Sequence, residues 1–475
     1  MVFPILGANT ESAAYEVSNS VRLAREDGGD LSRAPSSDGN RQIWTFSTWF
    51  KFGRPVYDVS GADYDIMSAN STNNFNDAIR LDSNGKLTYL AKVSGDTANG
   101  IKGSTPNLLR DPTAWYHIVV AVDSTQATNS NGLKMYVNGV QQTVAFNSYN
   151  QSINTSFNKS GSTMSIGHFE NDGGNHFDGY MCDTYWIDGT QYAADNFGEF
   201  NTNGVWVPKA ASVSFGTNGF FLEFKQTGTS QNSSGIGADT SGNDNHLAVT
   251  NIASTDSALA DTCTNNFCTL NPVAVKAGGE TNYTSRIVKA NLGADTTNNS
   301  DSYSFFGTMP TDMPFYYELK FLDVHSGGND IRVGISREEM TYQSGSHAEA
   351  HYRNSGDIHS FASDGSNVAS ANSGNQSFSD NDIIGVAADN TTNNNVKFYH
   401  NGTLQATINI DANELYQPYV RLYGNSTETE FSINFGNPHY SISSGNSDAN
   451  GYGNFEYDVP SGYYALCTKN LAEYG

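Results

Sequence analysis

Apolar and polar residues alternate along much of this chain with a period of two, the repeat that is typical of β-strands. The clearest case is residues 115–123, Trp-Tyr-His-Ile-Val-Val-Ala-Val-Asp, in which both alternating faces are largely apolar. A strand of that kind is covered on both sides, so we expect it inside a sheet. After a turn-rich segment the alternation resumes at Met135 and Val137 and stops at Asn138-Gly139, a typical hairpin turn. The pattern predicts an antiparallel hairpin.

The apolar alternation restarts in the second half of the chain, so the sequence predicts two β-rich blocks. The strand-like segments of the second block are residues 314–321, 331–336, 383–389, 396–402 and 431–436. No segment shows helical periodicity over three turns, and turn-forming residues are abundant, so the sequence predicts an all-β protein.

The length of 475 residues is too great for one ordinary core and predicts two domains. Residues 201–271 are rich in glycine and serine and contain one convincing strand at 219–224, which we expect to complete the first sandwich. We therefore predict a first domain at 1–200, a connector at 201–271 and a second domain at 272–475.

The order of short motifs resembles two known families. The run W-Y-H-I-V-V-A-V-D followed by K-M-Y-V-N-G resembles the central hairpin of the laminin-G-like (LamG) group of concanavalin A-like jelly rolls. The resemblance extends on both sides of the hairpin to residues 44–50, 65–68, 78–82, 164–167 and 177–188. In the second block, Y-Y-E-L-K, V-G-I-S, I-I-G-V-A-A-D, V-K-F-Y-H-N-G and I-N-F-G resemble a SPRY domain, a β-sandwich that usually serves as a recognition module. These resemblances imply a concanavalin A-like (LamG) jelly-roll sandwich followed by a SPRY-like β-sandwich.

Further segments are similar to LamG-like virion proteins of marine bacteriophages. They are residues 15–41, 237–246, 261–272 and 462–471, so this resemblance includes the connector. It implies a virion protein exposed on the particle surface, such as a tail fibre, a tail-associated protein or a capsid decoration component. Its partners would be other virion proteins and a host-surface glycan or protein.

Charge and catalytic motifs limit the alternatives. Forty-nine acidic against 25 basic residues give a formal net charge of −24, which disfavours nucleic acid as a partner. We also expect neither an export signal nor membrane insertion. The E-x-D-x-x-E strand of laminarinase-type jelly rolls is absent, as are G-x-S-x-G and H-E-x-x-H, so we expect no enzyme activity. The competing hypothesis is a free carbohydrate-binding or glycan-degrading protein with a laminarinase-like jelly roll.

Ligand contacts are expected on loops, where flexible glycine stands beside amide, imidazole and aromatic groups. One such loop is residues 169–176 and the other is residues 341–356. The candidate ligand-binding residues are Asn171, Asp172, Asn175, His176, His351, Tyr352 and Arg353. The plainer interpretation is that both segments are solvated turns. Trp44, Trp49 and Trp115 are expected to be scaffold.

Calcium is the one cofactor that the sequence suggests. Asp239, Asn243 and Asp244 concentrate oxygen ligands, although the segment lacks the position-six glycine and the distal glutamate of an EF-hand. An Asx-rich turn explains the same residues without a metal.

The cysteine spacing and the oligomeric state stay open at this level. Cys263 and Cys268 could close a small disulfide loop in an oxidising medium, or remain free thiols. Because weak contacts multiply when many copies are displayed together, we expect a homo-oligomer, of which a trimer is one form.

Overall fold

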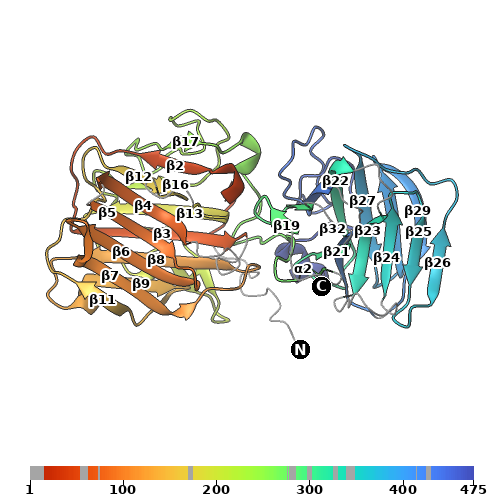
Figure 1. Cartoon of the computed structure of the whole chain (residues 1–475), viewed down its shortest axis with the longest axis horizontal. Helices are drawn as coiled ribbons and strands as arrows, with labels where there is room; N and C mark the ends of the chain where they lie inside the picture. The colour runs from red at the N-terminus through yellow and green to blue at the C-terminus, as the bar shows by residue number, and fades with distance from the viewer. Residues whose placement is uncertain are drawn as a thin grey trace. The chain divides into compact units, whose positions relative to one another are not determined.

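The computed structural model describes residues 15–53, 63–72, 75–169, 175–274, 276–277, 285–296, 302–324, 330–337, 348–412, 414–423 and 429–475. The chain forms two compact units, Met1–Thr264 and Asn265–Gly475, and strands are the main secondary structure of both (Figure 1).

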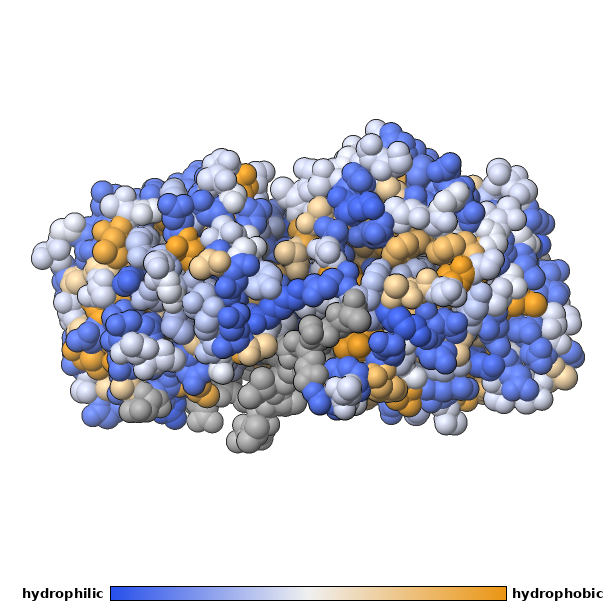
Figure 2. Space-filling view, turned by 180° about the vertical axis from the view of Figure 1, so that it is seen from behind, coloured by the Kyte–Doolittle hydropathy of each residue, from blue (hydrophilic) through white to orange (hydrophobic). Residues whose placement is uncertain are grey.

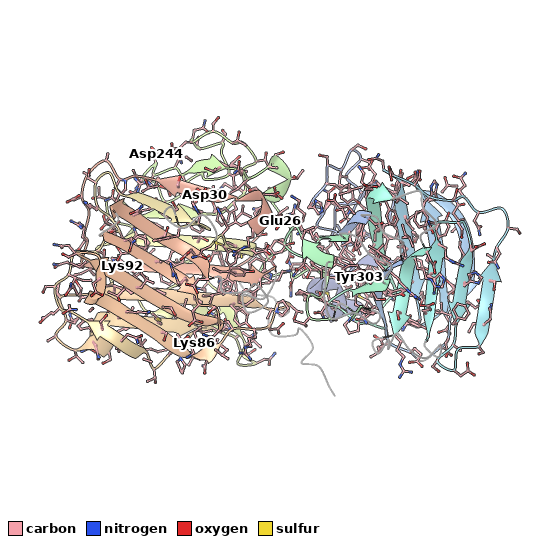
Figure 3. The ribbon with its side chains drawn as sticks, viewed as in Figure 1. Glu26, Asp30, Lys86, Lys92, Asp244 and Tyr303 are labelled. Carbon is pink, nitrogen blue, oxygen red and sulfur yellow. The ribbon has the colours of Figure 1, made fainter. Side chains whose placement is uncertain are left out.

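The first unit contains two large antiparallel sheets. Sheet 1 has the order β1 (Val21–Leu23), β13 (Gly179–Asp188), β3 (Ile43–Phe52), β8 (Trp115–Asp123), β9 (Leu133–Val137), β10 (Val140–Gln141), and β16 (Phe220–Leu222) also pairs with β13. Sheet 2 has the order β11 (Ala145–Tyr149), β7 (Asp96–Leu108), β6 (Lys86–Val93), β5 (Phe75–Leu81), β4 (Tyr64–Thr72), β12 (Thr163–Ile166), β2 (Asp30–Arg33), β17 (Ala248–Thr250). Lys86 and Lys92 mark the two ends of β6 in Figure 3.

The expected hairpin is present, and its first strand lies inside sheet 1. Strand β8 pairs with β3 on one side and with β9 on the other, where Ile118 lies opposite Val137. The alternation of apolar residues on both faces therefore identified an inner strand correctly. Helix α1 (Asn129–Gly132) lies in the turn-rich segment between the two strands.

Aromatic residues fill the core between the two sheets. Trp44 stacks on Trp186 with ring centroids 5.0 Å apart, and it meets the edge of Tyr89 from sheet 2 at 5.3 Å. The indole Nε1 of Trp186 donates to Asn158 at 2.8 Å. Trp44, Trp49 and Trp115 are all buried, as expected for scaffold residues.

Much of the expected connector belongs to the first unit. Strand β16 extends sheet 1, as predicted for the strand near residue 220, and β17 extends sheet 2 by pairing with β2. Strands β14 (Gly198–Phe200) and β15 (Trp206–Pro208) form a small separate sheet, and the 3₁₀ turns are η2 (Arg25–Asp27), η4 (Ala194–Asn196) and η5 (Ser254–Asp256). Strands β14, β15 and β17 are each three residues long, which is too short for a period-two pattern to be recognised in the sequence.

The second unit is also a sandwich of two sheets. Sheet 3 has the order β18 (Lys276–Ala277), β21 (Ser302–Phe306), β30 (Tyr416–Tyr423), β23 (Asp330–Arg337), β24 (Glu349–Arg353), β25 (Ile358–Phe361), β26 (Asn367–Ala371). Sheet 4 has the order β19 (Ser285–Val288), β20 (Gly293–Thr296), β31 (Thr429–Asn434), β22 (Phe315–Val324), β27 (Ile383–Asp389), β28 (Asn395–His400), β29 (Thr403–Asn409), and β32 (Tyr464–Ala465) runs parallel to β22. The chain ends in α2 (Thr468–Tyr474).

Rings from sheets 3 and 4 meet in the core of the second unit. Phe305 contacts Phe431 with centroids 5.5 Å apart, and Tyr352 contacts Phe398 at 6.0 Å. On the other side of sheet 4, the buried carboxylate of Glu318 accepts the backbone N–H groups of Glu456 and Tyr457 at 2.9 and 2.8 Å. These bonds hold the C-terminal segment against the sheet.

All four cysteines are free and buried. Cys263 lies in the first unit, where its thiol interacts with Cys182, and burial raises its pKa well above the usual value. Cys268 lies in the second unit.

The surface seen in Figure 2 is mostly hydrophilic, with apolar residues scattered over both units. Among the described residues, the large apolar side chains that are exposed are Leu108, Val140, Phe200, Val273, Val368, Leu404 and Leu415. None of the helices in the described ranges is long and apolar enough to cross a membrane.

The face of sheet 1 that points away from the core is also buried. His117 lies on it, and its Nδ1 accepts the indole N–H of Trp206 at 3.0 Å. The other nitrogen, Nε2, therefore carries the proton and donates to Ser47 at 2.9 Å. Burial lowers the pKa of His117 from 6.5 to about 3, so the ring is neutral and holds the β14–β15 hairpin against the sheet.

The first unit should lose stability in acid through His117. In the unfolded chain His117 is protonated below about pH 6.5, whereas in the folded chain it is protonated only below about pH 3. The free energy of unfolding therefore falls as the pH is lowered from 6.5 to 3. The loss should be on the order of 4 kcal/mol relative to His117→Gln, which can keep both hydrogen bonds. Urea unfolding at several pH values checks this, and an equal pH slope in the two proteins would contradict it.

The two units should fold independently. Thr264 donates to the carbonyl of Val17 in the first unit at 2.9 Å, whereas the N–H of Asn266 donates to Thr468 in the second at 3.0 Å. Chains that end at Thr264 or begin at Asn265 should each give a β-type circular dichroism spectrum and a cooperative thermal transition. An unfolded half would show that the division is wrong.

Candidate functional site

The outer face of sheet 3 carries a group of charged and ring-bearing side chains on three neighbouring strands. Along β23 and β24 the residues between the core positions face outward, and the register sets Arg332 opposite Arg353 and Gly334 opposite His351. Strand β25 continues the face, because His359 lies opposite His351. We call this group the charged face. Its members are Asp330, Arg332, Glu349, His351, Arg353, His359 and Phe361.

Ion pairs join the charged face into one network. Asp330 accepts from Arg332 Nη2 and from Arg353 Nε, both at 2.8 Å. Arg332 Nη1 also reaches Glu349 Oε1 at 3.1 Å, and the same oxygen lies 3.1 Å from His351 Nδ1. Two arginines and two carboxylates thus balance each other.

Burial and the neighbouring charged groups shift the pKa values of Asp330, His351 and His359. Burial by itself would raise the pKa of Asp330, but the hydrogen bonds and charges of Arg332 and Arg353 hold it below the usual range. Burial lowers the pKa of His351 despite the nearby Glu349. Burial also lowers the pKa of His359. At neutral pH Asp330 and Arg332 are therefore charged, whereas the imidazoles of His351 and His359 are neutral.

Accessible groups lie at one side of the network. The side chain of Arg353 is 32% exposed, and His359 and Phe361 are partly exposed, whereas Glu349 and His351 are buried. The rings of His359 and Phe361 are 6.0 Å apart. The accessible part of the face thus combines a guanidinium, an imidazole and an aromatic ring.

The structure corrects the expected placement of three candidate residues. His351, Tyr352 and Arg353 lie on strand β24 and not in a loop. Alternation along the strand sends Tyr352 into the core, where its ring meets Phe378 and its hydroxyl donates to the carbonyl of Gln376. Of the three, Arg353 offers accessible polar atoms, and ligand binding by these residues stays a prediction. Residues 341–347 of that segment lie outside the described residues.

The sequence analysis missed His359 and Phe361 as candidates. A strand could have been predicted here, because residues 358–361, Ile-His-Ser-Phe, alternate with the period of a strand. They follow a four-residue turn after Arg353. What the sequence could not supply is the register that brings His359 beside His351.

In the other candidate loop, the structure describes Asn175 and His176, whereas Asn171 and Asp172 lie outside the described residues. Both described side chains are partly buried. The ring of His176 stacks on His168 with centroids 4.1 Å apart, and Arg25 donates to the His176 carbonyl at 3.2 Å. Burial, followed by the charges of His168 and Arg25, lowers the pKa of His176 to about 4. Asn175 and His176 are thus packed against neighbouring residues of the first unit, and their role in ligand binding stays a prediction.

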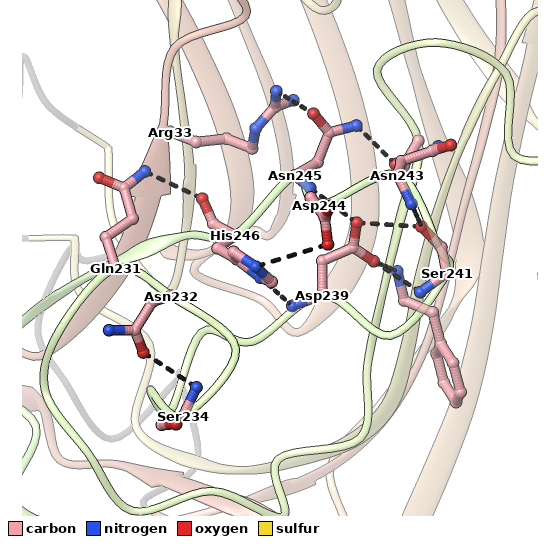
Figure 4. A network of polar contacts seen from close by, with 12 residues as sticks. Arg33, Gln231, Asn232, Ser234, Asp239, Ser241, Asn243, Asp244, Asn245 and His246 are labelled. Carbon is pink, nitrogen blue, oxygen red and sulfur yellow. Dashed lines mark hydrogen bonds and ion pairs between the residues drawn. The ribbon is translucent and has the colours of Figure 1, made fainter.

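The suspected calcium loop is a closed hydrogen-bond network (Figure 4). Asp239 Oδ1 accepts the N–H groups of Phe221 and Ser241 at 2.9 and 2.8 Å. Its Oδ2 accepts the N–H of Asn245 at 2.9 Å and the hydroxyl of Ser241 at 3.0 Å. Four donors saturate this carboxylate, which leaves it no lone pair for a cation.

The other two expected ligands do not converge on Asp239. Asn243 donates its amide to the carbonyls of Gly216 and Gly219 at 2.8 and 3.0 Å. Asp244 is 89% exposed and lies on the outside of the first unit (Figure 3). Within the described part of the chain, no three His, Cys, Asp or Glu side chains gather as a metal-binding group. Asp239 and Asn243 thus take part in an Asx-type turn network, and calcium binding by Asp239, Asn243 and Asp244 stays a prediction.

Each of the two β-sandwich units matches the model of a known domain family. The family model described as the Concanavalin A-like lectin/glucanases superfamily matches residues 26–195, and the SPRY domain model matches residues 314–437. The chain thus contains a LamG-type concanavalin A-like domain followed by a SPRY domain, and the predicted fold class is confirmed. No curated protein matches the chain.

Solved structures show distant similarity in fold. The SPRY domain of human HERC1 is 13% identical, with 34% of this chain and 96% of that domain covered and a TM-score of 0.27. A SAP-like pentraxin from Limulus polyphemus is 14% identical, with 38% and 80% covered and a TM-score of 0.28. A putative carbohydrate binding protein from Bacteroides ovatus is 13% identical, with 50% and 59% covered and a TM-score of 0.32. At these values the similarities carry no functional conclusion.

Asp239 should stabilise the first unit without calcium. Asp239→Ala removes the acceptor of four hydrogen bonds and should lower the free energy of unfolding by about 1–3 kcal/mol. The loss should be the same in calcium and in EDTA, measured by chemical denaturation. A calcium-induced stabilisation that disappears in Asp239→Ala would contradict the assignment.

Proposed function

We propose that this chain is a bacteriophage virion adhesion protein that binds a host-surface glycan through the charged face of its SPRY domain. The observation that carries the proposal is the charge-balanced network of the charged face, with Arg353, His359 and Phe361 accessible beside it.

The chemistry of the face suits a neutral polar ligand. Arg332 and Arg353 are paired with Asp330 and Glu349, so the formal charges of these four groups cancel. Sugars instead offer hydroxyl groups to planar donors and acceptors, and an apolar ring face to an aromatic side chain. The accessible guanidinium, imidazole and phenyl groups match these needs.

The pairing within the network also prepares the face for binding. Arg353 is held by Asp330 at 2.8 Å before any ligand arrives, so little side-chain entropy is lost on contact. Imidazoles that are neutral at pH 7 can donate and accept at once, as hydroxyl groups do.

The virion assignment rests on the similarity of residues 15–41, 237–246, 261–272 and 462–471 to marine phage virion proteins. A tail fibre, a tail-associated protein or a capsid decoration component displays many copies on one particle, and weak contacts with a glycan then add up to firm adhesion. Homo-oligomers, trimers among them, and contacts with other virion proteins belong to this proposal.

The glycan-binding role can be tested with Arg353→Ala/His359→Ala. This double variant should bind host surface polysaccharide at least about tenfold more weakly, because it removes the accessible polar anchors of the face. Binding of the purified chain to a glycan array and to host cells measures the effect. The matched control is Arg337→Ala, which lies on the same strand β23 but pairs with Glu414 outside the charged face.

Equal binding by the wild-type chain and the double variant, with unchanged thermal unfolding, would remove the charged face from the proposal. Binding that Arg337→Ala reduces as much as the double variant would also overturn it.

A further inference from the structure

The outer face of sheet 1 carries a row of four residues that run directly across its strands. The register sets Arg22 on β1 opposite Tyr180 on β13, Tyr180 opposite Lys51 on β3, and Lys51 opposite Trp115 on β8. All four side chains are buried, although two of them are cationic. Something must therefore cover and neutralise this row.

The segment 253–264 supplies the opposite charges. Asp256 accepts from Arg22 Nε and Nη2 at 2.9 and 2.8 Å, and Asp261 accepts from Lys51 Nζ. The hydroxyl of Ser20 donates to the backbone carbonyl of Asp261 at 2.5 Å and fixes the segment there. The last residues of the first unit are thus held on the back of one of its central strands.

Lys51 and Asp261 are sealed from water. Their side chains are 1% and 0% exposed. The ammonium nitrogen lies 5.8 Å from the ring centre of Trp115 and 5.0 Å from that of Tyr180. The indole Nε1 of Trp115 donates to Asp261 Oδ1 at 3.3 Å, while Lys51 contacts the other oxygen, Oδ2. The amine and the two carboxyl oxygens are therefore fixed relative to one another.

We propose that Lys51 and Asp261 condense to an intramolecular isopeptide bond. In a site without water, transfer of a proton from the ammonium to the carboxylate gives a neutral amine and a carboxylic acid, because burial disfavours both charges. The Nζ lone pair then attacks Cγ of Asp261. The bond from Cγ to Oδ2 breaks, and Oδ2 leaves as water with the acid proton and one amine proton. An amide remains, and no oxidant or reductant is needed.

Trp115 has a defined part in this step. As Nζ adds to Cγ, negative charge develops on Oδ1, the oxygen to which the indole N–H already donates. The folded chain also holds the amine against the carboxyl group, which replaces an encounter in solution by a positioned contact. Water is excluded from the side chains of both Lys51 and Asp261, so the amide that they form is protected from hydrolysis.

Other ion pairs of the described residues lack these features. The guanidinium of Arg22 stays protonated and delocalised, and Asp256 is 17% exposed. Lys225 and Glu223 are 46% and 35% exposed, so water competes for both groups. The bond is thus specific to the Lys51–Asp261 pair, and it would close a covalent loop between residues 210 positions apart.

Intact mass spectrometry of the denatured full chain tests the proposal. The wild-type protein should be lighter than its sequence by one water, and fragmentation should give a branched peptide that joins residues 51 and 261. Lys51→Arg should have the full mass, because the guanidinium does not condense. The matched control Arg22→Ala breaks the neighbouring ion pair and should keep the loss of water.

Wild-type protein at its full sequence mass would overturn the proposal, whatever the variants do. A loss of water that remains in Lys51→Arg, or that maps to a succinimide within one peptide and not to a branched one, would overturn it as well. The glycan-binding test has a separate readout on the other unit, so either result stands without the other.

Discussion

Strand β8 must be covered on both faces, and much of the first unit is arranged to meet that requirement. Its inward residues pack against sheet 2 through the aromatic core around Trp44 and Trp186. Its outward residues, Trp115 and His117, are covered by chain that comes much later in the sequence. The hairpin β14–β15 and the segment 253–264 pack against the first unit because they bury the apolar residues on the outer face of sheet 1.

The polar groups on that covered face are paired because water cannot reach them. His117 exchanges hydrogen bonds with Trp206 and Ser47, and Arg22 and Lys51 meet carboxylates from the covering segment. Each of these bonds joins residues that are distant in sequence, so they specify which segment covers which strand. A buried ion pair adds little net stability, and its value here lies in specifying that arrangement.

The second unit uses the same architecture with a different outcome. The outer face of sheet 3 keeps a balanced charged network at its surface, where Arg353, His359 and Phe361 remain partly accessible. Sheet 4 instead covers its outer face with the C-terminal segment, which Glu318 holds through two backbone N–H groups. One sandwich unit thus provides both a covered face and an open one, and the open face is where we propose that a ligand binds.

Local alternation in the sequence determined the class of the fold. The hairpin at 115–139, the inner position of its first strand and the burial of Trp44, Trp49 and Trp115 follow from period-two patterning, because a residue's face on a strand depends only on its neighbours. The same local chemistry allowed two interpretations of Asp239, a calcium ligand or an Asx turn, and in the structure its carboxylate accepts four hydrogen bonds of such a turn network.

Tertiary structure alone decided the rest. A histidine in a glycine-flanked segment suggested a loop, yet pairing with β23 made His351 part of a strand and sent Tyr352 into the core. The meeting of Lys51 with Asp261 depends on register and chain path across 210 residues, which no local pattern encodes. Sequence fixes which side chains share a strand face, whereas only the packed chain determines which distant groups must neutralise one another once water is excluded.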